Sequence, residues 1–596
     1  MKTKYLLIAA LAGLALVGCN KEKGGEPVSD GTHYMAFHIS MASSTKGTSA
    51  GYEDGTDAEN AINSVYFYFY KDGAYISRGK GEVAGEFEAV AGTTPSIEEL
   101  WRKSDGKGVV VIESNLNTKP NQLLCVINSP NPEFFRNKSL AQALNALQTG
   151  DTGVTGSASY SEIGFAKMTT SGSPVYFSMI NSPVIEGSNP VYALSFNESK
   201  IKGSKNEAAD DPVEVYVERM AAKVNVNSAT LVKDPSLDAW DITIDQWGLN
   251  AVTQSAYAIK KIDAAWASNA AFSGWVLGDN RVNWAIDPDY DGSTFAFDNE
   301  DYYPHSAREY GMNATSVSST ARTSSARLKY WSKNEIAAHD AATLPAFDKL
   351  RQMYAMENTF DANGQNDPRY VGTHVLVLAT VKKAGQPAED LYFYMGALRT
   401  LTEYQTALLV RAETDYPLYV EDTTPGTYRR IAGSDLEIRK AYKPDDFATN
   451  GGYYALATAT TSDKGYTDGY VTLYPKAGLT LYKEAATPGD YEAIPADHQD
   501  KAFLEDIADI ANAYIGGSMW YCVPIEHLGT TTEGKYGVVR NTVYNITLQN
   551  IKSLGHGIYD PNEPIVPGEK AENWYISAKI NVNAWNIVNQ NSDLEE

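Results

Sequence analysis

The sequence predicts a mainly β protein, with two β-rich domains in tandem and one spare strand at each end of the chain. Tyrosine supplies most of the aromatic residues, with 39 copies in 596 residues, and tyrosine is enriched in strands together with Thr and Val. Stretches whose side chains alternate between two faces recur along the chain, and this period of two is typical of strands. A chain of this length also has room for more than one domain.

The formal net charge is −24, and hydrophobic residues make up 43% of the chain. That hydrophobic share is ordinary for a globular protein. The acidity argues against a nucleic acid as partner and favours a soluble, self-repelling surface.

The first 18 residues predict a lipoprotein signal peptide. Lys2 and Lys4 give a positive start, and Leu6 to Val17 is an apolar run too short to span a bilayer as a helix. Gly18 before Cys19 is typical of bacterial lipoprotein signals, in which the cysteine is lipidated, for instance with palmitate, and becomes the first residue. We therefore expect export and a first attachment to the membrane through lipid alone. Asn20 favours the outer membrane, by analogy with other lipoproteins.

A strand is predicted at 33–41, because four apolar residues there alternate on one face: Met35, Phe37, Ile39 and Met41. The next segment, 42–60, is rich in Ser, Thr, Gly and Asp and is expected to be an exposed loop. It contains Lys46, the only basic residue between Lys23 and Lys71. A protease that cuts between Lys46 and Gly47 would detach the strand.

Further strands follow in the first domain. The run from Ile62 to Tyr70 places Val65, Phe67 and Phe69 on one side and tyrosines on the other, and Lys71-Asp72-Gly73 turns it back. Strands are also expected at 109–112 and 123–127. Ser139 with Gln142 has the spacing of a capping box, so a short helix is predicted from there to Gly150.

The second domain is predicted to open with one long strand at 215–226. A hairpin of 375–381 with 391–395, a helix over 503–514, and strands at 518–525 and 543–551 follow. No tandem repeat is evident. After a linker stiffened by three prolines, the last strand pattern presents one alternating set of small and aliphatic residues: Ile576, Ala578, Ile580, Val582 and Ala584.

No catalytic constellation stands out, and we expect no enzyme. Gly47-Thr48-Ser49-Ala50-Gly51 matches G-x-S-x-G, but it lies in a low-complexity loop and not between a strand and a helix. Cys125 and Cys522 each lie in an apolar strand pattern. Core thiols are expected for both, with a bridge between them as the alternative.

One acidic segment matches the start of a calcium-binding loop, so calcium is the single cofactor considered. Asp287, Asp289 and Asp291 precede Gly292, and Asp298 stands at the twelfth position. Carboxylates at alternate positions can converge on one hard cation. An ordinary acidic surface turn is the competing interpretation, since the flanks do not look helical and Pro288 is unusual in such a loop.

The chain resembles the type V pilins, the fimbrillin family of Bacteroidales. Besides the lipobox, three segments carry the resemblance: Gly51-Tyr52-Glu53-Asp54-Gly55, the V-E-R-M-A-A-K-V run at 217–224, and a C-terminal group comprising 521–527, 537–544 and 560–564. The length is similar to that of the larger, short-fimbria shaft subunit.

This resemblance implies two transthyretin-like β-sandwich domains and a pilus shaft. In the family, a trypsin-like protease cuts the loop after the first strand, usually at Arg, and a neighbour's C-terminal strand fills the groove. The expected division is a signal peptide at 1–18, a lipidated propeptide with the removable strand at 19–46, an N-terminal domain at 47–213, a C-terminal domain with inserted helices and loops at 214–567, and a donor-strand tail at 568–596. Lys46 departs from the family's Arg, so either the protease accepts Lys or another enzyme acts.

Two functions are therefore expected in competition. The first is a fimbrial shaft subunit, lipidated at the outer membrane as a precursor, that supports adhesion and biofilm formation. Its partners would be head-to-tail copies of itself, accessory tip and anchor pilins, and ligands on host or bacterial surfaces. The second is a monomeric, outer-membrane-anchored lipoprotein that binds glycans. The spare C-terminal strand favours the first.

Overall fold

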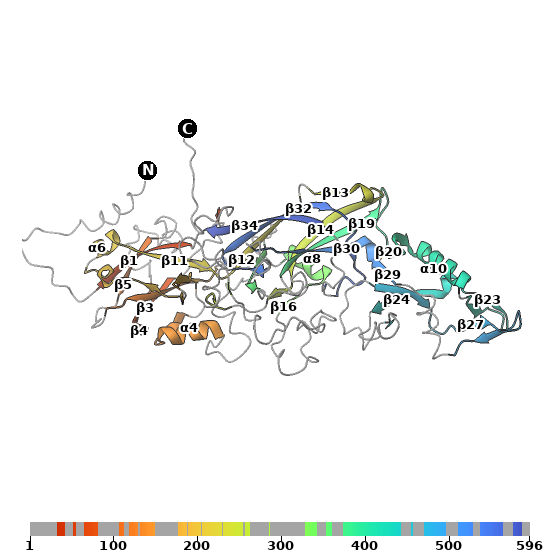
Figure 1. The fold of residues 1–596 in the computed structure, drawn as a ribbon, viewed down its shortest axis with the longest axis horizontal. Coiled ribbons are helices and arrows are strands. Elements are labelled where there is room, and N and C mark those ends of the chain that lie inside the picture. The colour runs from red at the N-terminus through yellow and green to blue at the C-terminus, as the bar shows by residue number, and fades with distance from the viewer. Residues whose placement is uncertain are drawn as a thin grey trace, which may run out of the picture.

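The protein is elongated, with its sheets arranged one after another along the long axis (Figure 1). The computed structural model describes residues 33–41, 52–54, 65–80, 107–112, 119–128, 132–149, 177–187, 189–203, 205–228, 231–253, 257–262, 285, 328–329, 331–342, 353–359, 373–415, 417–442, 455–456, 470–495, 510–527, 537–563, 565 and 576–586. Strands outnumber helices throughout these segments, so the mainly β prediction is confirmed.

The first sheet has eight strands and contains the N-terminal strand in its interior. Its order is β4 (Ala74–Lys80), β3 (Val65–Lys71), β6 (Gln122–Ile127), β7 (Met179–Asn181), β11 (Val213–Arg219), β1 (His33–Met41) and β5 (Lys107–Ile112), with β10 (Leu194–Ser195) beside β6. Helix α4 (Leu140–Thr149) packs on one face, and α6 (Lys205–Asp210) lies near β1 and β5.

Both faces of β3 are buried, as its alternating pattern allows. Phe67 and Phe69 lie in one core and Tyr68 and Tyr70 in another, under α4. The predicted turn at 71–73 is present, with Asp72 and Gly73 at positive φ angles of 48° and 83°. Both features agree with the sequence-based expectation.

The capping box of α4 is also present. The Ser139 amide donates to the side chain of Gln142 over 2.9 Å, and the Gln142 amide donates to the Ser139 hydroxyl over 3.2 Å. Two backbone donors at the start of the helix are thereby satisfied.

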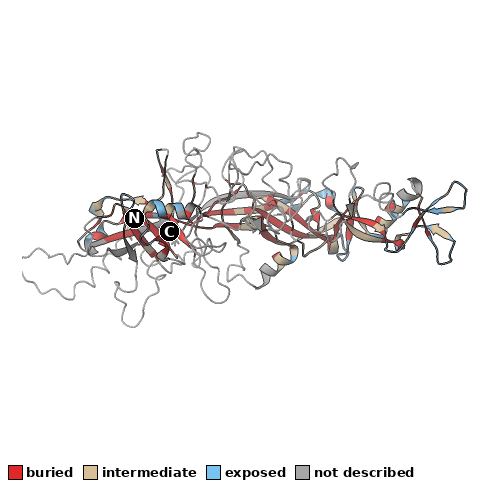
Figure 2. Ribbon diagram, turned by 90° about the horizontal axis from the view of Figure 1, so that it is seen from below, coloured by how far each residue is buried: buried red, intermediate tan, exposed pale blue. Residues whose placement is uncertain are grey.

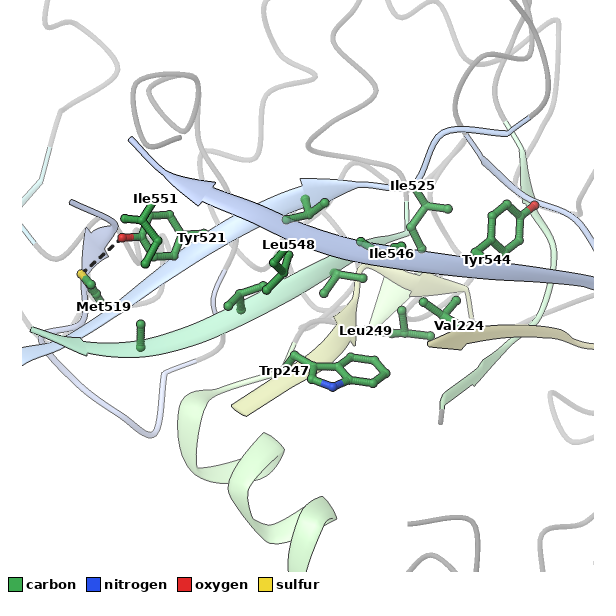
Figure 3. Packing of buried hydrophobic residues seen from close by; sticks show 14 of the residues in the cluster. Val224, Trp247, Leu249, Met519, Tyr521, Ile525, Tyr544, Ile546, Leu548 and Ile551 are labelled. Carbon is green, nitrogen blue, oxygen red and sulfur yellow. Dashed lines mark hydrogen bonds between the residues drawn. The ribbon is translucent and has the colours of Figure 1, made fainter. Parts of the chain in front are cut away.

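A second and a third sheet pack face to face around the central core shown in Figure 3. The second sheet has the order β17 (Met353–Ala355), β12 (Ala222–Asn227), β32 (Thr542–Ile551), β34 (Ile576–Asn586) and β2 (Tyr52–Asp54), with β13 (Val232–Lys233) beside β32. The third contains β14 (Trp240–Asn250), β19 (His374–Lys383), β30 (Ser518–Pro524) and β33 (His556–Gly557), and α8 (Lys333–Ala342) covers its outer face.

The far end of the molecule is built from a fourth and a fifth sheet. The fourth has the order β21 (Ala397–Thr400), β20 (Leu391–Tyr394), β29 (Ala511–Tyr514), β26 (Tyr470–Pro475), β24 (Leu436–Tyr442) and β25 (Ala455–Leu456), and α10 (Leu401–Asp415) packs on it. The fifth is β23 (Tyr428–Arg430), β22 (Tyr419–Glu421), β27 (Leu481–Glu484) and β28 (Tyr491–Ala493). Its exposed turns lie at the tip in Figures 1 and 2. Three two-stranded ladders complete the set: β8 (Val184–Glu186) with β9 (Asn189–Val191), β15 (Val252–Thr253) with β16 (Leu328–Lys329), and β18 (Asn358–Thr359) with β31 (Gly537–Val538).

The predicted long strand at 215–226 is wrong, because it is two strands in different sheets. The chain breaks at Met220 and Ala221: the Met220 amide donates to the Ser178 carbonyl, and the Ala221 carbonyl accepts from the Asn541 amide. β11 ends in the first sheet and β12 begins in the second. Apolar alternation continues through the break, so the pattern alone does not reveal it.

Two further local predictions are wrong for the same kind of reason. β19 pairs with β14 and β30, whereas β20 pairs with β21 and β29, so the turn between them does not close a hairpin. Residues 511–514, expected at the end of a helix, form β29, all four of them buried. A short, fully buried strand cannot be distinguished from a helix by periodicity.

Cys125 is buried and Cys522 is half-buried, and neither forms a disulfide. Of the two alternatives considered from the sequence, the structure therefore has no bridge between them. Burial raises the pKa of the Cys125 thiol well above its ordinary value, as expected for an inert core cysteine.

Candidate strand-exchange site

The first strand of the chain is an integral part of the first sheet. β1 pairs antiparallel with β5 through residues 33–38 and parallel with β11 through residues 37–41. Within the described chain, β1 is the strand that joins β5 to β11, because the sheet order places it between them. Loss of β1 would therefore leave a slot bordered by backbone groups on both sides.

The core beneath this slot depends on the side chains of β1. Met35 and Phe37 are fully buried, and the ring of Phe37 stacks on Phe67 with centroids 4.2 Å apart. Burial of one large aliphatic or aromatic side chain contributes about 1.5–3 kcal/mol. A chain without β1 would expose Phe67 and the apolar residues of β11 that share this core.

The last strand, β34, lies in another sheet. It pairs antiparallel with β32 from Ile576 opposite Ile551 to Ala584 opposite Thr542, with one irregularity between Leu548 and Asn550. Its end also pairs in parallel with β2, where Tyr52, Glu53 and Asp54 are opposite residues 584–586. The tail is thus held by its own chain on two sides.

The positions of the predicted tail set follow from this register. Ala578, Ile580 and Val582 are the Cα partners of Leu548, Ile546 and Tyr544, and all three partners on β32 have buried side chains. Residues directly opposite one another on antiparallel strands share a face of the sheet. The alternating set predicted from the sequence therefore lies opposite the residues of β32 whose side chains are buried in the core.

β2 follows closely on the predicted cleavage position in the sequence. Residues 52–54 come after Lys46 and Gly47, so they stay with the chain when residues 1–46 are removed. Because β2 pairs with the end of β34, the segment just after the predicted cleavage position and the C-terminal strand are joined by backbone pairing. The sequence motif that contains β2 gave no indication of this pairing.

Buried charges connect the first sheet to the second. Arg540, which precedes β32, contacts Glu357 over 2.7 Å, with exposed side-chain fractions of 0% and 1%. The same guanidinium donates to the carbonyls of Tyr257 and Ala258 over 2.6 and 3.3 Å. Ala258 in turn packs in the core beneath the first sheet.

A second buried pair lies on the first-sheet side of this junction. Glu218 of β11 contacts Lys260 over 2.8 Å, with exposed side-chain fractions of 2% and 4%. Burial raises the pKa of Glu218, and the charges of Lys260 and Arg540 act against that shift. We refer to Glu218, Lys260, Glu357 and Arg540 as the charge junction.

Sequence reasoning did not identify the charge junction, although a signal was present. Glu218 and Arg540 are charged residues that directly follow apolar residues, Val217 and Val539. Charged residues are almost never fully buried unless they are paired. Such a residue therefore predicts a buried partner, but not which residue that partner is.

Several predicted site residues lie outside the described residues, so their predictions stay predictions. They are the lipidation site Cys19, the cleavage position at Lys46 and Gly47, and the calcium candidates Asp287, Asp289, Asp291 and Asp298. Within the described segments, no group of three or more His, Cys, Asp and Glu side chains could hold a metal ion. Among the same residues, no helix has the length and apolar character needed to cross a membrane.

The fold and the site define a mainly β protein. Its first strand, β1, and its last strand, β34, each pair with strands from distant parts of the sequence. Residues 512–591 match the family model described as "Major fimbrial subunit protein type IV, Fimbrillin, C-terminal". This match includes all but the first residue of β29 and the whole of β30, β32 and β34, and it confirms the resemblance to fimbrillins in the C-terminal region. None of the curated proteins matches the sequence.

Solved structures that the chain resembles have low identity. A fimbrilin from Porphyromonas gingivalis W83 is 12% identical, covering 94% of this chain and 98% of its own, with a TM-score of 0.34. A protein of suggested cell-adhesion function from Parabacteroides distasonis is 10% identical, with coverage of 93% and 96% and a TM-score of 0.34. The tip fimbrial protein Mfa3 of Porphyromonas gingivalis is 10% identical, with coverage of 93% and 100% and a TM-score of 0.27.

Proposed function

We propose that this chain is a structural subunit of a surface fimbria, polymerised by exchange of its terminal strands. The observation that carries the proposal is the position of β1, an interior strand at the N-terminal end of the chain that links β5 to β11. The fimbrillin match over 512–591 supports the same class of protein. The role is structural and adhesive, not catalytic.

The proposed maturation starts from a lipoprotein precursor at the outer membrane. Cleavage after Lys46 releases the mature chain from its lipid at Cys19 and allows β1 to leave the first sheet. The empty slot exposes apolar side chains and unpaired backbone groups, which makes it unstable alone. A strand from another subunit can satisfy both, as in other cases of strand addition.

β34 of a neighbouring subunit is the proposed occupant. It is a terminal strand with an alternating apolar set, and it is connected to the rest of the chain through a proline-containing linker. The contact is head to tail and does not close, so it extends into a filament. Accessory pilins would start and end the filament, and adhesion and biofilm formation would follow from its surface ligands.

β34 would have a partner strand on both sides in either of two places, its own second sheet or the slot of β1 in a neighbour. β34 has Cα partners on both β32 and β2 in its own chain, and the slot of β1 offers partners on both β11 and β5. Each backbone hydrogen bond contributes about 0.5–1.5 kcal/mol net, so backbone pairing alone does not favour the exchange. The driving force is then the difference between the apolar contacts that β34 gains in the slot of β1 and those that it leaves beside β32. Release of the tail from its own chain is then a barrier to polymerisation.

The first test is the N-terminal sequence of protein in filaments. Purified fimbriae labelled by antibody to this chain in electron micrographs should yield chains that begin at Gly47. Filaments composed of chains that begin at Cys19 would contradict the proposed maturation. Labelled protein found only as membrane-bound monomers would instead favour the glycan-binding lipoprotein.

A second prediction concerns β2 as a strap over the tail. Replacing Tyr52, Glu53 and Asp54 with Gly-Ser-Gly removes a good strand former, Tyr52, and introduces two glycines, which weaken strands, so it should weaken the ladder that holds the end of β34. Mature protein with this change should polymerise with a shorter lag, measured by light scattering. The control is the same replacement at residues 485–487, in an exposed turn at the other end of the molecule.

An unchanged or longer lag in the β2 variant would mean that this ladder does not restrain the tail. An equal shortening in the control variant would assign the effect to general loosening of the chain.

A further inference from the structure

The fifth sheet is built from an internal duplication whose two copies are separated in the sequence by residues 432–480, so they do not form a tandem repeat. Residues 418–431 and 481–494 share the pattern L-Y-x-E-x-x-T-P-G-x-Y-x-x-I. Each copy forms a hairpin, β22 with β23 and β27 with β28. We call them the twin hairpins; they lie at the tip of the molecule farthest from the first sheet (Figure 1).

The twin hairpins meet through equivalent positions. β22 pairs antiparallel with β27, so that Tyr419 is opposite Tyr482, and the sheet has a local pseudo-twofold axis there. The turns are fixed in the same way, because the amides of Gly426 and Gly489 donate to the carboxylates of Glu421 and Glu484 over 2.8 and 3.2 Å.

Four tyrosines share one face of this sheet and contact one another. The ring centroids of Tyr419 and Tyr491 are 4.6 Å apart. The ring centroid of Tyr428 lies 4.7 Å from that of Tyr482 and 4.7 Å from that of Tyr491. The opposite face carries Leu418, Val420, Leu481 and Ile494 into the core under α10. The tyrosine face is therefore not part of that core.

One half of the tyrosine face already holds a cation from its own chain. The guanidinium of Arg430 lies over the ring of Tyr419, 4.7 Å from its centroid. Arg430 is exposed and is the cross-strand partner of Tyr419. Its presence demonstrates that this face accommodates a guanidinium stacked on a tyrosine.

The duplication is broken at the position that supplies this cation. The equivalent of Arg430 in the second hairpin is Ala493, which is exposed and is the cross-strand partner of Tyr482. Tyr482 is half-buried and also contacts Tyr428. The second half of the face thus presents a similar ring with a methyl group in place of a guanidinium.

The charge at the edge of this half is negative. Glu484 is on the same strand face as Tyr482, two residues further along, and it is the cross-strand partner of Tyr491. Burial, the neighbouring Tyr419 and the carboxylate of Glu484 together raise the pKa of Tyr491. The whole chain carries −24, so long-range attraction also favours a basic partner.

We propose that the tyrosine face around Tyr482, with Tyr428 and Glu484 beside it, binds a lysine or arginine side chain presented by a basic segment of a partner protein. The side chain would stack on Tyr482 as Arg430 stacks on Tyr419, and Glu484 would face its charge. One cation–π contact of this kind strengthens binding by about two- to thirtyfold. A single contact therefore gives weak binding, and repetition of the site along a filament would multiply it.

The test uses the purified full chain and a fluorescent Gly-Arg-Gly-Arg-Gly peptide, with binding followed by anisotropy. A peptide with citrulline in place of arginine keeps the shape without the charge and should bind about tenfold more weakly. Ala493→Arg places a guanidinium over Tyr482 from within the chain and should weaken arginine-peptide binding about five- to tenfold.

Two variants separate the site from general electrostatics. Ala486→Arg makes the same change in charge in an exposed turn and should leave binding within about twofold. Arg430→Ala uncovers the equivalent ring of Tyr419, so the number of peptides bound should rise from one to two.

Three results would overturn the proposal. One is equal weakening by Ala493→Arg and Ala486→Arg, which would mean non-specific attraction. Another is equal affinity for the citrulline peptide. The third is binding of a neutral probe, cellohexaose, in the absence of arginine-peptide binding, which would assign the tyrosine face to glycans.

Discussion

Removal of residues 571–596 is expected to abolish filament formation and to leave a secreted, folded monomer. β32 keeps its pairing with β12 when β34 is gone, so the second sheet survives with a new edge. The matured chain then has a slot in the first sheet but no strand to donate. Electron microscopy and size-exclusion chromatography of the truncated chain provide the measurement.

Two point variants test the face of the tail that the exchange uses. Ile580→Asp places a charge at a register position opposite the buried Ile546, and an unpaired charge in an apolar groove costs several kcal/mol. Filaments should be absent. Lys579→Asp changes the neighbouring position, opposite the half-buried Thr547, and should reduce filament yield by no more than about twofold.

Polymerisation of the truncated chain would show that another surface joins the subunits. If Ile580→Asp and Lys579→Asp reduced filament formation equally, β34 would not insert into the slot with one particular face toward the core. The melting temperature of each monomer is the control, because Ile580 has a core-facing register in its own chain as well.

Arg540→Met is expected to destabilise the protein by about 3–5 kcal/mol, the usual cost of removing one partner of a buried ion pair. It leaves the carboxylate of Glu357 buried without its guanidinium and removes the donors to the Tyr257 and Ala258 carbonyls. Urea unfolding followed by tryptophan fluorescence measures the loss. Lys483→Met, which breaks an exposed pair with Glu492, is the matched control and should cost less than about 1 kcal/mol.

The stability lost in Arg540→Met should depend on pH, because the charge of Arg540 affects the pKa of Glu218. Burial raises the pKa of Glu218 in the folded state, so the stability that its protonation contributes is complete below the ordinary carboxyl pKa and is lost as the pH rises through the raised value. Arg540 opposes this shift, and its removal should raise the pKa of Glu218 further. The variant should therefore lose more stability at pH 8 than at pH 5. If Arg540→Met lost the same stability at pH 5 and at pH 8, Glu218 would not be coupled to Arg540.

The alternation of side chains along single strands could be predicted from the sequence. Val65, Phe67 and Phe69 face one core as expected, and the turn at Asp72 and Gly73 is present, because these features depend on neighbours in the chain. The same is true of the capping box of α4. The mainly β class follows from the same local signals.

Pairing between distant segments could not be predicted in the same way. Nothing local indicates that β1 lies between β5 and β11, that Arg540 finds Glu357, or that β11 and β12 separate at Met220. The duplication in the twin hairpins was present in the sequence, but the intervening strands separate its copies, and six of its fourteen positions differ. The lipid, cleavage and calcium positions remain predictions from sequence.

The charge junction has a mechanical consequence. If subunits are joined through the slot of β1 in the first sheet and through a tail that leaves the second sheet, tension along the filament must cross from one sheet to the other inside every subunit. The chain itself crosses this boundary between β2 and β3 and again at Met220 and Ala221. The bonds from the buried guanidinium of Arg540 to the carbonyls of Tyr257 and Ala258 bridge the same boundary. Sideways separation of the sheets would need buried charges to part without water. The force that a filament withstands is then set inside its subunits as well as at their joints.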